Sequence, residues 1–378
     1  MPPSIILLFM YLRELTITNY RNIEAASLSF SPFINCFAGD NGMGKTNVLD
    51  AIYFLSICRG HSAVRDADNL RHGASCFVIE GDYEFDNGGQ HHVFCGYKQG
   101  GRKTVKTDGK DVKKLSSHVG QIPLVMISPD DSELITGGSE CRRNFMDAVL
   151  IQHDAAYLDA LIRYERSLKQ RNSLLKQEEG FDAGLMDVLE EMMDADAAKI
   201  YEAREKFVQD FVPLFLKVYR QLSGVETEEV GIVYESHGSR GPLLKWLRDW
   251  REKECIVGYS LHGPHKDDLL FQLQGHAVKR EASQGQQKTF FIALKLAQYL
   301  YLKERGEYRT PLLLLDDLFD KLDAGRVECL IRFVSQTDFG QIFITDTSRV
   351  HLEDILPKIG RPYFLFDVKN GVVLPQMA

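Results

Sequence analysis

The chain lacks a long apolar run. Among its 378 residues, none of the hydrophobic stretches approaches the ~20 apolar residues of a membrane-spanning helix. The apolar segment 5–9 is too short for the core of a secretory signal and no basic residues precede it. We therefore expect a cytoplasmic protein with no membrane contact, in which a short extension precedes the functional start at Met10.

Paired cysteines and an excess of positive charge are missing as well. The seven cysteines form no C-x-x-C pair, which argues against a disulfide framework or a zinc site and is typical of reduced thiols. The net charge of −8 means that the molecule as a whole does not attract polyanions. Contact with a nucleic acid would therefore need a local basic surface. The hydrophobic fraction of 44% is ample for a buried core and suggests two or three lobes.

Hydrophobic periodicity predicts an alternation of strands and helices. Residues 11–38 and 76–115 are expected to form strands, the second group as an antiparallel meander, and residues 47–56 a helix. The region 130–225 has helical periodicity and could be a helical hairpin, with Pro213 expected to kink or end its second part. Strands are then expected at 230–234, 269–273, 312–315 and 341–345, and a long helix at 285–304.

A glycine-rich loop stands between a predicted buried strand and a predicted helix. Glycines let backbone N–H groups approach phosphates, Lys45 would bridge the β- and γ-phosphates of ATP, and the Thr46 hydroxyl would ligate Mg²⁺. A chance match in a loop is the alternative, and the flanking strand and helix argue against it. The loop fits G-x-x-x-x-G-K-[ST] in full: Gly39, Asp40, Asn41, Gly42, Met43, Gly44, Lys45, Thr46.

Two carboxylates follow the apolar strand expected at 312–315. The strand is apolar on both faces, as in a parallel core sheet, and Asp316 comes at its carboxyl end. Asp316 would hold Mg²⁺ through water, and Asp317 would polarise the attacking water as a catalytic residue beside Lys45. In sites of this kind the residue at the position of Asp317 is usually the longer Glu. The alternative is an acidic pair that only caps the strand.

The long helix expected at 285–304 opens with a polar segment. This segment could be an ordinary helix cap, or a signature segment that presents the helix terminus to the γ-phosphate held by another subunit. Asp320 and Asp323 stand where a D-loop is expected. The strand near 341–345 contains no histidine, so a Thr or an Asp would take the orienting role. The signature segment consists of Ser283, Gln284, Gly285, Gln286 and Gln287.

These motifs, together with three further segments, resemble the RecF family of bacterial recombination mediators, which is related to the SMC-type ABC ATPases. The resemblance runs from about residue 10 to the carboxyl terminus. Lys266 and Lys288 stand where the family typically has Arg, and Met146 where it has Leu. The resemblance implies an ATP-dependent homodimer that binds DNA gaps or single-strand/duplex junctions and cooperates with RecR and RecO in loading the recombinase RecA. The three further segments are 142–147, 170–176 and 263–268.

The predicted fold class is α/β: an ABC-type P-loop ATPase head with an antiparallel β meander and an inserted helical lobe. Long coiled-coil arms are excluded because the segment between Thr46 and Ser283 is short and partly β. We expect residues 10–125 and 256–378 to form the two parts of the ATPase lobe. Residues 126–255 would form the helical lobe.

Two basic segments are candidates for DNA contact. Residues 102–114 carry six cationic and two acidic side chains, and residues 163–176 carry five cationic side chains and one acidic one, counting Arg171. Contacts of this kind go mainly to phosphates and carry little sequence information. A solvated charged face is the alternative for either segment. The candidate DNA-binding residues are Lys103, Lys106, Arg163, Arg166 and Lys169.

Three functions share the glycine loop. The leading prediction is a weak ATPase of recombinational repair and replication-fork maintenance, with ATP and Mg²⁺ as cofactors. A transporter ATPase subunit would share the loop, the signature and the carboxylate strand. The glutamine-rich signature, the missing histidine and the basic helical face favour repair. A metabolic P-loop kinase needs no signature segment, so residues 283–287 argue against it.

Overall fold

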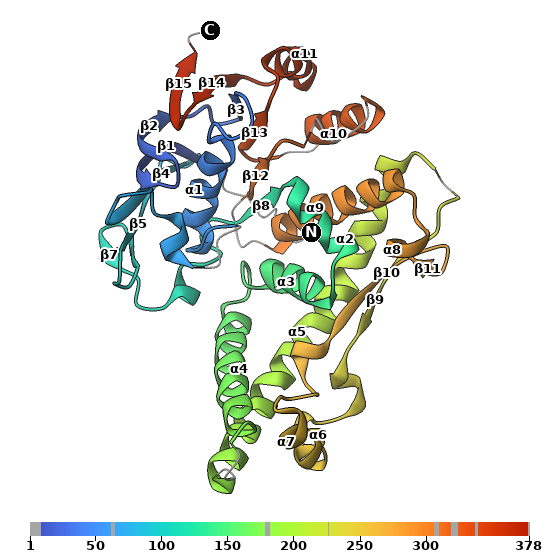
Figure 1. Cartoon of the computed structure of the whole chain (residues 1–378). Helices are drawn as coiled ribbons and strands as arrows, with labels where there is room; N and C mark the ends of the chain where they lie inside the picture. Colours follow the sequence, from blue (N-terminus) through green and yellow to red (C-terminus); the bar gives the residue numbers. More distant parts are fainter. Residues whose placement is uncertain are drawn as a thin grey trace. The chain divides into compact units, whose positions relative to one another are not determined.

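The computed structural model describes residues 9–61, 65–177, 182–225, 227–305, 310–318, 324–336 and 339–376. The chain forms two compact units (Figure 1). The first consists of Met1–Ser132, Gln221–Ser223 and Lys288–Ala378, and the second of Glu133–Arg220 and Gly224–Gln287. The first unit is therefore assembled from both ends of the chain, as expected from the sequence.

One sheet of the first unit is antiparallel, with six strands in the order β2-β1-β4-β5-β6-β7. Side chains of β1 alternate between buried and less buried positions, and Leu12, Leu15 and Ile17 lie on the buried face. The expected meander is confirmed. The strands are β1 (Met10–Tyr20), β2 (Ile23–Ser29), β4 (Cys76–Phe85), β5 (Gln90–Lys98), β6 (Thr104–Thr107) and β7 (Lys110–Asp111).

The other sheet of the first unit has the order β15-β14-β3-β13-β12-β8. All its neighbours are parallel except β14 and β15. Every residue of β12 is buried, as its unbroken apolar sequence predicts. The strands are β3 (Ile34–Ala38), β8 (Leu124–Ile127), β12 (Leu312–Leu315), β13 (Ile342–Asp346), β14 (Tyr363–Lys369) and β15 (Val372–Gln376).

One hydrophobic core joins these two sheets with helix α1 (Lys45–Ile57). It contains Leu15 and Phe77 from the antiparallel sheet, Ile52 from α1, and Leu314 and Phe343 from the parallel sheet. This packing fixes the start of α1 next to the carboxyl ends of the parallel strands. The other helices of this unit are α10 (Ala324–Gln336), α11 (Arg349–Ile359), and α9 (Gln284–Arg305) from Lys288 onward.

The second unit is built around a helical hairpin. Helix α4 (Ala155–Leu174) and helix α5 (Ala183–Ser223) are antiparallel, because Arg163 pairs with Asp196 while Arg171 pairs with Glu190. A kink or an end was expected at Pro213; the helix does not end there, because buried Phe211 and Phe215 continue its packed face on both sides. The hairpin is drawn in green in Figure 1.

The second unit also contains a three-stranded antiparallel sheet in the order β11-β10-β9. Short helices complete the unit. The remaining elements are α2 (Glu133–Thr136), α3 (Ser139–Leu150), β9 (Val230–Glu235), α6 (Leu243–Asp249), α7 (Arg251–Val257), β10 (Asp268–Leu273), β11 (His276–Ala277) and α8 (Val278–Glu281).

The unit boundaries differ from the expected 125/126 and 255/256. The first falls after Ser132, because β8 pairs with β12 and so belongs to the parallel sheet. The second falls after Gln287, because β10 pairs with β9 along its whole length and keeps the chain in the second unit. The inserted lobe is therefore mixed α and β. Within the described part of the chain, none of the helices is long and apolar enough to cross a lipid bilayer.

Candidate nucleotide-binding site

The glycine loop connects β3 to α1 at the carboxyl edge of the parallel sheet. Gly44 caps α1 with φ 110°, and a Cβ there would lie 2.6 Å from Asn22 Oδ1. At Gly39 a Cβ would lie 2.3 Å from the Val368 carbonyl oxygen. Both positions therefore require glycine on steric grounds. Asp40, Asn41 and Gly42 are exposed at the tip of the loop, so it is open to a ligand.

Asn22 braces this loop, and the sequence analysis missed it. Its Nδ2 donates to the Met43 carbonyl at 3.1 Å, and its Oδ1 accepts from Asn47 Nδ2 at 2.7 Å. Asn22 belongs to the tight turn between β1 and β2, where Arg21 has φ 51°. A polar turn next to a buried strand was the available signal, but the sequence could not show which loop the turn contacts.

Lys45 lies folded against the loop and is 3% exposed. Its Nζ donates to the carbonyl oxygens of Gly39 at 2.8 Å and Asp40 at 3.3 Å. The Asp317 carboxylate lies 3.5 Å away. Most of the partners of this cation are neutral carbonyls, which a phosphate could replace with a stronger, charge-assisted contact.

Thr46 and Asp316 meet although they are distant in the sequence. The Thr46 hydroxyl donates to Asp316 Oδ1 at 3.0 Å, and the Thr345 hydroxyl donates to the same oxygen at 2.7 Å. Burial raises the pKa of Asp316 above its ordinary value and the Asp317 carboxylate adds to the rise, against the opposing effect of the two hydroxyls. The cluster offers hard oxygen ligands of the kind that Mg²⁺ takes.

Asp317 adopts a left-handed backbone with φ 41°, which is rare for a residue other than Gly, Asn or Asp. Its N–H donates to the Thr345 hydroxyl at 2.8 Å. Thr345 thus contacts both carboxylate residues from the neighbouring strand β13. Asp346 instead accepts from the Ser348 N–H at 2.7 Å and lies 3.0 Å from His351. A threonine or an aspartate was expected to take the orienting role of a histidine on this strand. Thr345 is the threonine that contacts Asp316 and Asp317.

A third carboxylate, Asp131, lies just beyond β8 at the same edge of the sheet. Lys295 from α9 approaches it to 3.0 Å, and His61 to 3.4 Å. Burial alone would raise the pKa of Asp131, but Lys295 and His61 outweigh burial and hold the pKa well below its ordinary value. The sequence analysis missed Asp131, although an acidic pair follows this buried apolar strand after Ser128 and Pro129, much as Asp316 and Asp317 follow theirs.

The signature segment belongs to the second unit and starts α9. Ser283 Oγ accepts from the Gln286 N–H at 3.2 Å, and Gln286 Oε1 accepts from the Ser283 N–H at 2.9 Å. This reciprocal arrangement is a capping box. Gln287 donates to the Ala282 carbonyl at 3.1 Å, and Ser283 and Gln284 are exposed. Gly285 is the second residue of α9. Asp320 and Asp323, the expected D-loop, lie outside the described residues.

The candidate DNA-binding residues differ in how far their charges are already paired. Lys103 contacts the Asp66 carboxylate at 3.1 Å and is 22% exposed. Lys106 lies 4.0 Å from Asp111 and 5.9 Å from the centre of the Phe94 ring. Both side chains are therefore partly engaged within the first unit.

On α4, Arg163 pairs with Asp196 at 2.6 Å, whereas Arg166 and Lys169 are exposed. Arg171, counted in the same basic segment, is fully buried and contacts Glu190 and Glu254 at 2.8 and 2.6 Å. The sequence analysis was wrong to count Arg171 toward a surface charge. Its guanidinium instead holds the hairpin to α7.

Comparison with known proteins places the chain in a family. Residues 11–364 match the family model described as RecF/RecN/SMC N terminal domain. The DNA replication and repair protein RecF of Phocaeicola vulgatus is 52% identical over 96% of this chain and 98% of its own. The protein of the same name from Porphyromonas gingivalis is 46% identical over 96% of this chain and 100% of its own.

Solved structures agree with this result. A structure of the recombination mediator protein RecF with ATPrS, in the RecFOR pathway, matches with a TM-score of 0.88 and 26% identity over 99% of this chain and 100% of that one. An Smc head domain from Pyrococcus furiosus matches with a TM-score of 0.56 at 15% identity, which supports the fold alone. None of these relatives supports the transporter alternative. The chain belongs to the RecF family and has the ABC-type ATPase head fold.

Proposed function

We propose that this chain is an ATP-dependent DNA-binding protein of recombinational repair and replication-fork maintenance. It is a weak ATPase that dimerises with ATP on gapped or junction DNA and helps to load a recombinase in the cytoplasm. The observation that carries the proposal is the cluster of Lys45, Thr46, Asp316 and Asp317 around Thr345, in a chain of the RecF family. RecR and RecO are the partners that the family resemblance suggests.

Each residue of the cluster has a proposed role. The backbone N–H groups of the glycine loop and the Lys45 ammonium would bind the β- and γ-phosphates of ATP. Thr46 and Asp316 would hold Mg²⁺, which neutralises phosphate charge when bound. Asp317 would orient and polarise the attacking water. Its strained backbone and its bond to Thr345 support this role, because they fix the side chain beside Lys45.

The role of Asp317 can be separated from that of Asp316. Asp317→Asn should keep ATP affinity and dimerisation but slow hydrolysis about a hundredfold or more, because a general base contributes ~10²–10⁴ in rate. Single-turnover hydrolysis, together with nucleotide titration, measures both properties. Turnover at the wild-type rate in Asp317→Asn would assign the base to another residue.

The signature segment would act on ATP held by a second copy. Ser283 and Gln286 of each copy would face the γ-phosphate of the ATP held by the other copy. Because two such contacts form, the interface would have two-fold symmetry. The capping box supports this idea because it gives the start of α9 one defined conformation, with Ser283 and Gln284 exposed at the positive end of the helix.

Sedimentation velocity with and without ATP and a gapped duplex tests the proposed function. ATP should convert monomer to dimer, and the duplex should favour the dimer further, because ligands that bind one state reinforce each other. Ser283→Arg should fold normally and fail to dimerise. Ser239→Arg is the matched control, because Ser239 is also exposed in the second unit but lies outside the signature. If Ser283→Arg dimerises with ATP as wild type does, the cross-subunit role is wrong.

A further inference from the structure

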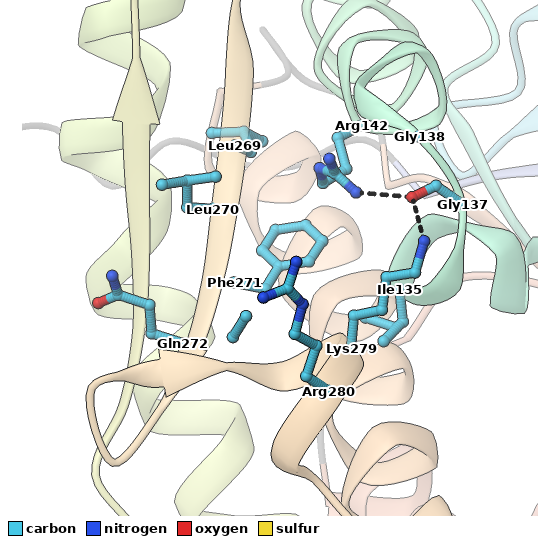
Figure 2. Close-up of a pocket in the computed structure, with 11 residues that line it drawn as sticks. Ile135, Gly137, Gly138, Arg142, Leu269, Leu270, Phe271, Gln272, Lys279 and Arg280 are labelled. Carbon is cyan, nitrogen blue, oxygen red and sulfur yellow. Dashed lines mark hydrogen bonds between the residues drawn. The ribbon is translucent and has the colours of Figure 1, made fainter.

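The second unit contains a pocket of about 530 Å³ beside strand β10 (Figure 2). Its walls come from the region between α2 and α3, from β10 and from α8. The volume falls within the ~300–1,000 Å³ of typical ligand-binding pockets. None of the residues assigned to nucleotide or DNA binding lines it.

One edge of β10 faces this pocket and is only partly paired. Strand β9 pairs with β10 from Asp268 to Leu273, whereas β11 pairs only with Gln272 and Leu273 on the other side. A tight turn at Gln274 and Gly275 sends the chain into the two-residue β11 and then into α8. In the described part of the chain, no other strand extends the sheet on this side of β10. On this side the Leu269 N–H already donates to Asp268 Oδ1 at 2.8 Å, so a segment that lies along β10 would be held mainly through its side chains.

The pocket combines apolar walls with positive charge. Ile135, Leu269 and Phe271 supply apolar surface. Among the described residues that line the pocket, none is acidic. Arg142 is already paired with Asp268 at 2.7 Å, so its charge is neutralised. Its Nη1 also donates to the Gly137 carbonyl at 3.1 Å, as Figure 2 shows.

Two cations on α8 remain without a carboxylate partner among the described residues. Lys279 Nζ contacts only the neutral Gly137 carbonyl, at 3.5 Å. Arg280 is exposed, and Figure 2 shows its guanidinium extending toward the side of Phe271. The charge that the pocket can offer to a ligand therefore comes from α8.

We propose that this pocket is a docking groove for an extended segment of a partner protein that carries carboxylates and one bulky apolar side chain. The segment would lie along β10, Lys279 and Arg280 would bind its carboxylates, and the apolar walls would bury its large side chain. DNA would use the cations but not the apolar walls, so the lining favours a peptide. Two residues, Glu281 and Ala282, separate the last lining residue, Arg280, from the start of the signature segment at Ser283.

Fluorescence anisotropy of a labelled peptide, titrated with the full chain, tests the proposal. Nucleotide is left out, so the result does not depend on the proposed ATP site. The probe is a short peptide of alternating valine and glutamate with one central phenylalanine. It should bind saturably. The double variant Lys279→Glu/Arg280→Glu should bind it at least about tenfold more weakly, because charge-assisted contacts become repulsive. The charge-matched control is Lys245→Glu/Arg248→Glu on α6, outside the pocket, which should bind as wild type does.

A second variant tests the groove by filling it. Gly138 lines the pocket, has φ −83°, and would have nothing within 4 Å of an added Cβ. Gly138→Phe should therefore fold normally and block the peptide. The proposal is overturned if the Lys279→Glu/Arg280→Glu variant binds the peptide as tightly as the α6 control does. It is also overturned if a peptide with glutamine in place of every glutamate binds wild type as tightly as the original peptide does. It is also overturned if the α8 variant loses affinity only for a DNA oligonucleotide, which would make the pocket a phosphate-binding surface.

Discussion

Lys45 in the first unit and Arg171 in the second are both buried cations, but their partners differ. Lys45 is held by two backbone carbonyl oxygens, with the nearest carboxylate 3.5 Å away. Arg171 contacts the carboxylates of Glu190 and Glu254 at 2.8 and 2.6 Å, and donates to the Ser260 hydroxyl. The charge of Arg171 is therefore matched within the fold, whereas most of the charge of Lys45 remains available to a ligand.

This difference separates the cation that we propose binds ATP from the one that holds the second unit together. A buried cation paired with carboxylates costs several kcal/mol to desolvate, and removing one partner leaves the others uncompensated. A cation held by neutral carbonyls at an open loop can exchange those partners for a phosphate. Substitution of Arg171 should therefore affect mainly stability, substitution of Lys45 mainly ATP affinity, and residues with partial pairing should fall between these extremes.

The largest effect is expected at Arg171. Arg171→Met should lower the free energy of unfolding of the second unit by about 3–5 kcal/mol, because two buried carboxylates lose their shared cation. Urea unfolding followed by tryptophan fluorescence measures this, because both tryptophans, Trp246 and Trp250, lie in the second unit.

Lys169→Met on the same helix is the matched control for Arg171→Met. Lys169 is exposed, so its replacement should change the free energy of unfolding by no more than about 0.5 kcal/mol. Equal stability of the two variants would show that the Arg171 network does not hold the fold.

Much of the nucleotide site could be predicted from the sequence because its signals are local. Gly44 and Lys45 follow a buried apolar strand and open a helix, and Asp316 ends another apolar strand. Carboxyl ends of parallel strands meet at one edge of a sheet, so the contact between Thr46 and Asp316 follows from the pattern.

The rest depends on contacts that no local pattern encodes. The buried face of α4 includes the polar residues Ser167 and Arg171 beside Tyr164, a pattern that hydrophobic periodicity does not predict. The buried face is set by Glu190 and Glu254, which come from other helices. Asn22 and Asp131 likewise reach the glycine loop and the sheet edge only through long-range pairing of strands.

Lys45→Ala should produce the second largest effect. ATP affinity should fall about a hundredfold or more, because the phosphates lose a charged donor in a mostly buried setting. Far-UV circular dichroism should be unchanged, because the carbonyls of Gly39 and Asp40 lie at a loop that water can reach. Calorimetric titration measures the affinity, with the exposed Lys110→Ala as control. Undiminished affinity would remove Lys45 from the site.

Asp316→Asn tests whether a group that is proposed to hold Mg²⁺ lowers the stability of the fold. The asparagine Oδ1 can still accept from Thr46 and Thr345, so only the buried charge is lost. Because the folded pKa of Asp316 is raised, the folded state holds a proton that the unfolded state releases, and stability falls as pH rises through the folded pKa. The variant should therefore gain stability over wild type from pH 3.8, the ordinary pKa, to neutral pH.

The measurement for Asp316→Asn is urea unfolding followed by far-UV circular dichroism, without nucleotide, at acidic and neutral pH. A Mg²⁺ titration with ATP present should show affinity weakened about tenfold, because Mg²⁺ loses a carboxylate ligand. A stability difference that does not change with pH would mean that Asp316 carries no buried charge.

The smallest effects are expected on the exposed face of α4, where pairing is partial. Arg166 and Lys169 are exposed, whereas Arg163 shares its charge with Asp196 at 2.6 Å. If this face contacts DNA, Arg166→Ala/Lys169→Ala should lower the slope of log K against log [salt] by about two, at about one per lost phosphate contact. Arg163→Ala should lower it by less than about one, because its charge is already partly neutralised.

Anisotropy titrations of a gapped duplex over a range of salt concentrations measure both slopes, and several duplex sequences should respond alike. An unchanged slope in the double variant would make this face a solvated surface, and an equal loss per residue in Arg163→Ala would mean that Asp196 gives up its partner to DNA.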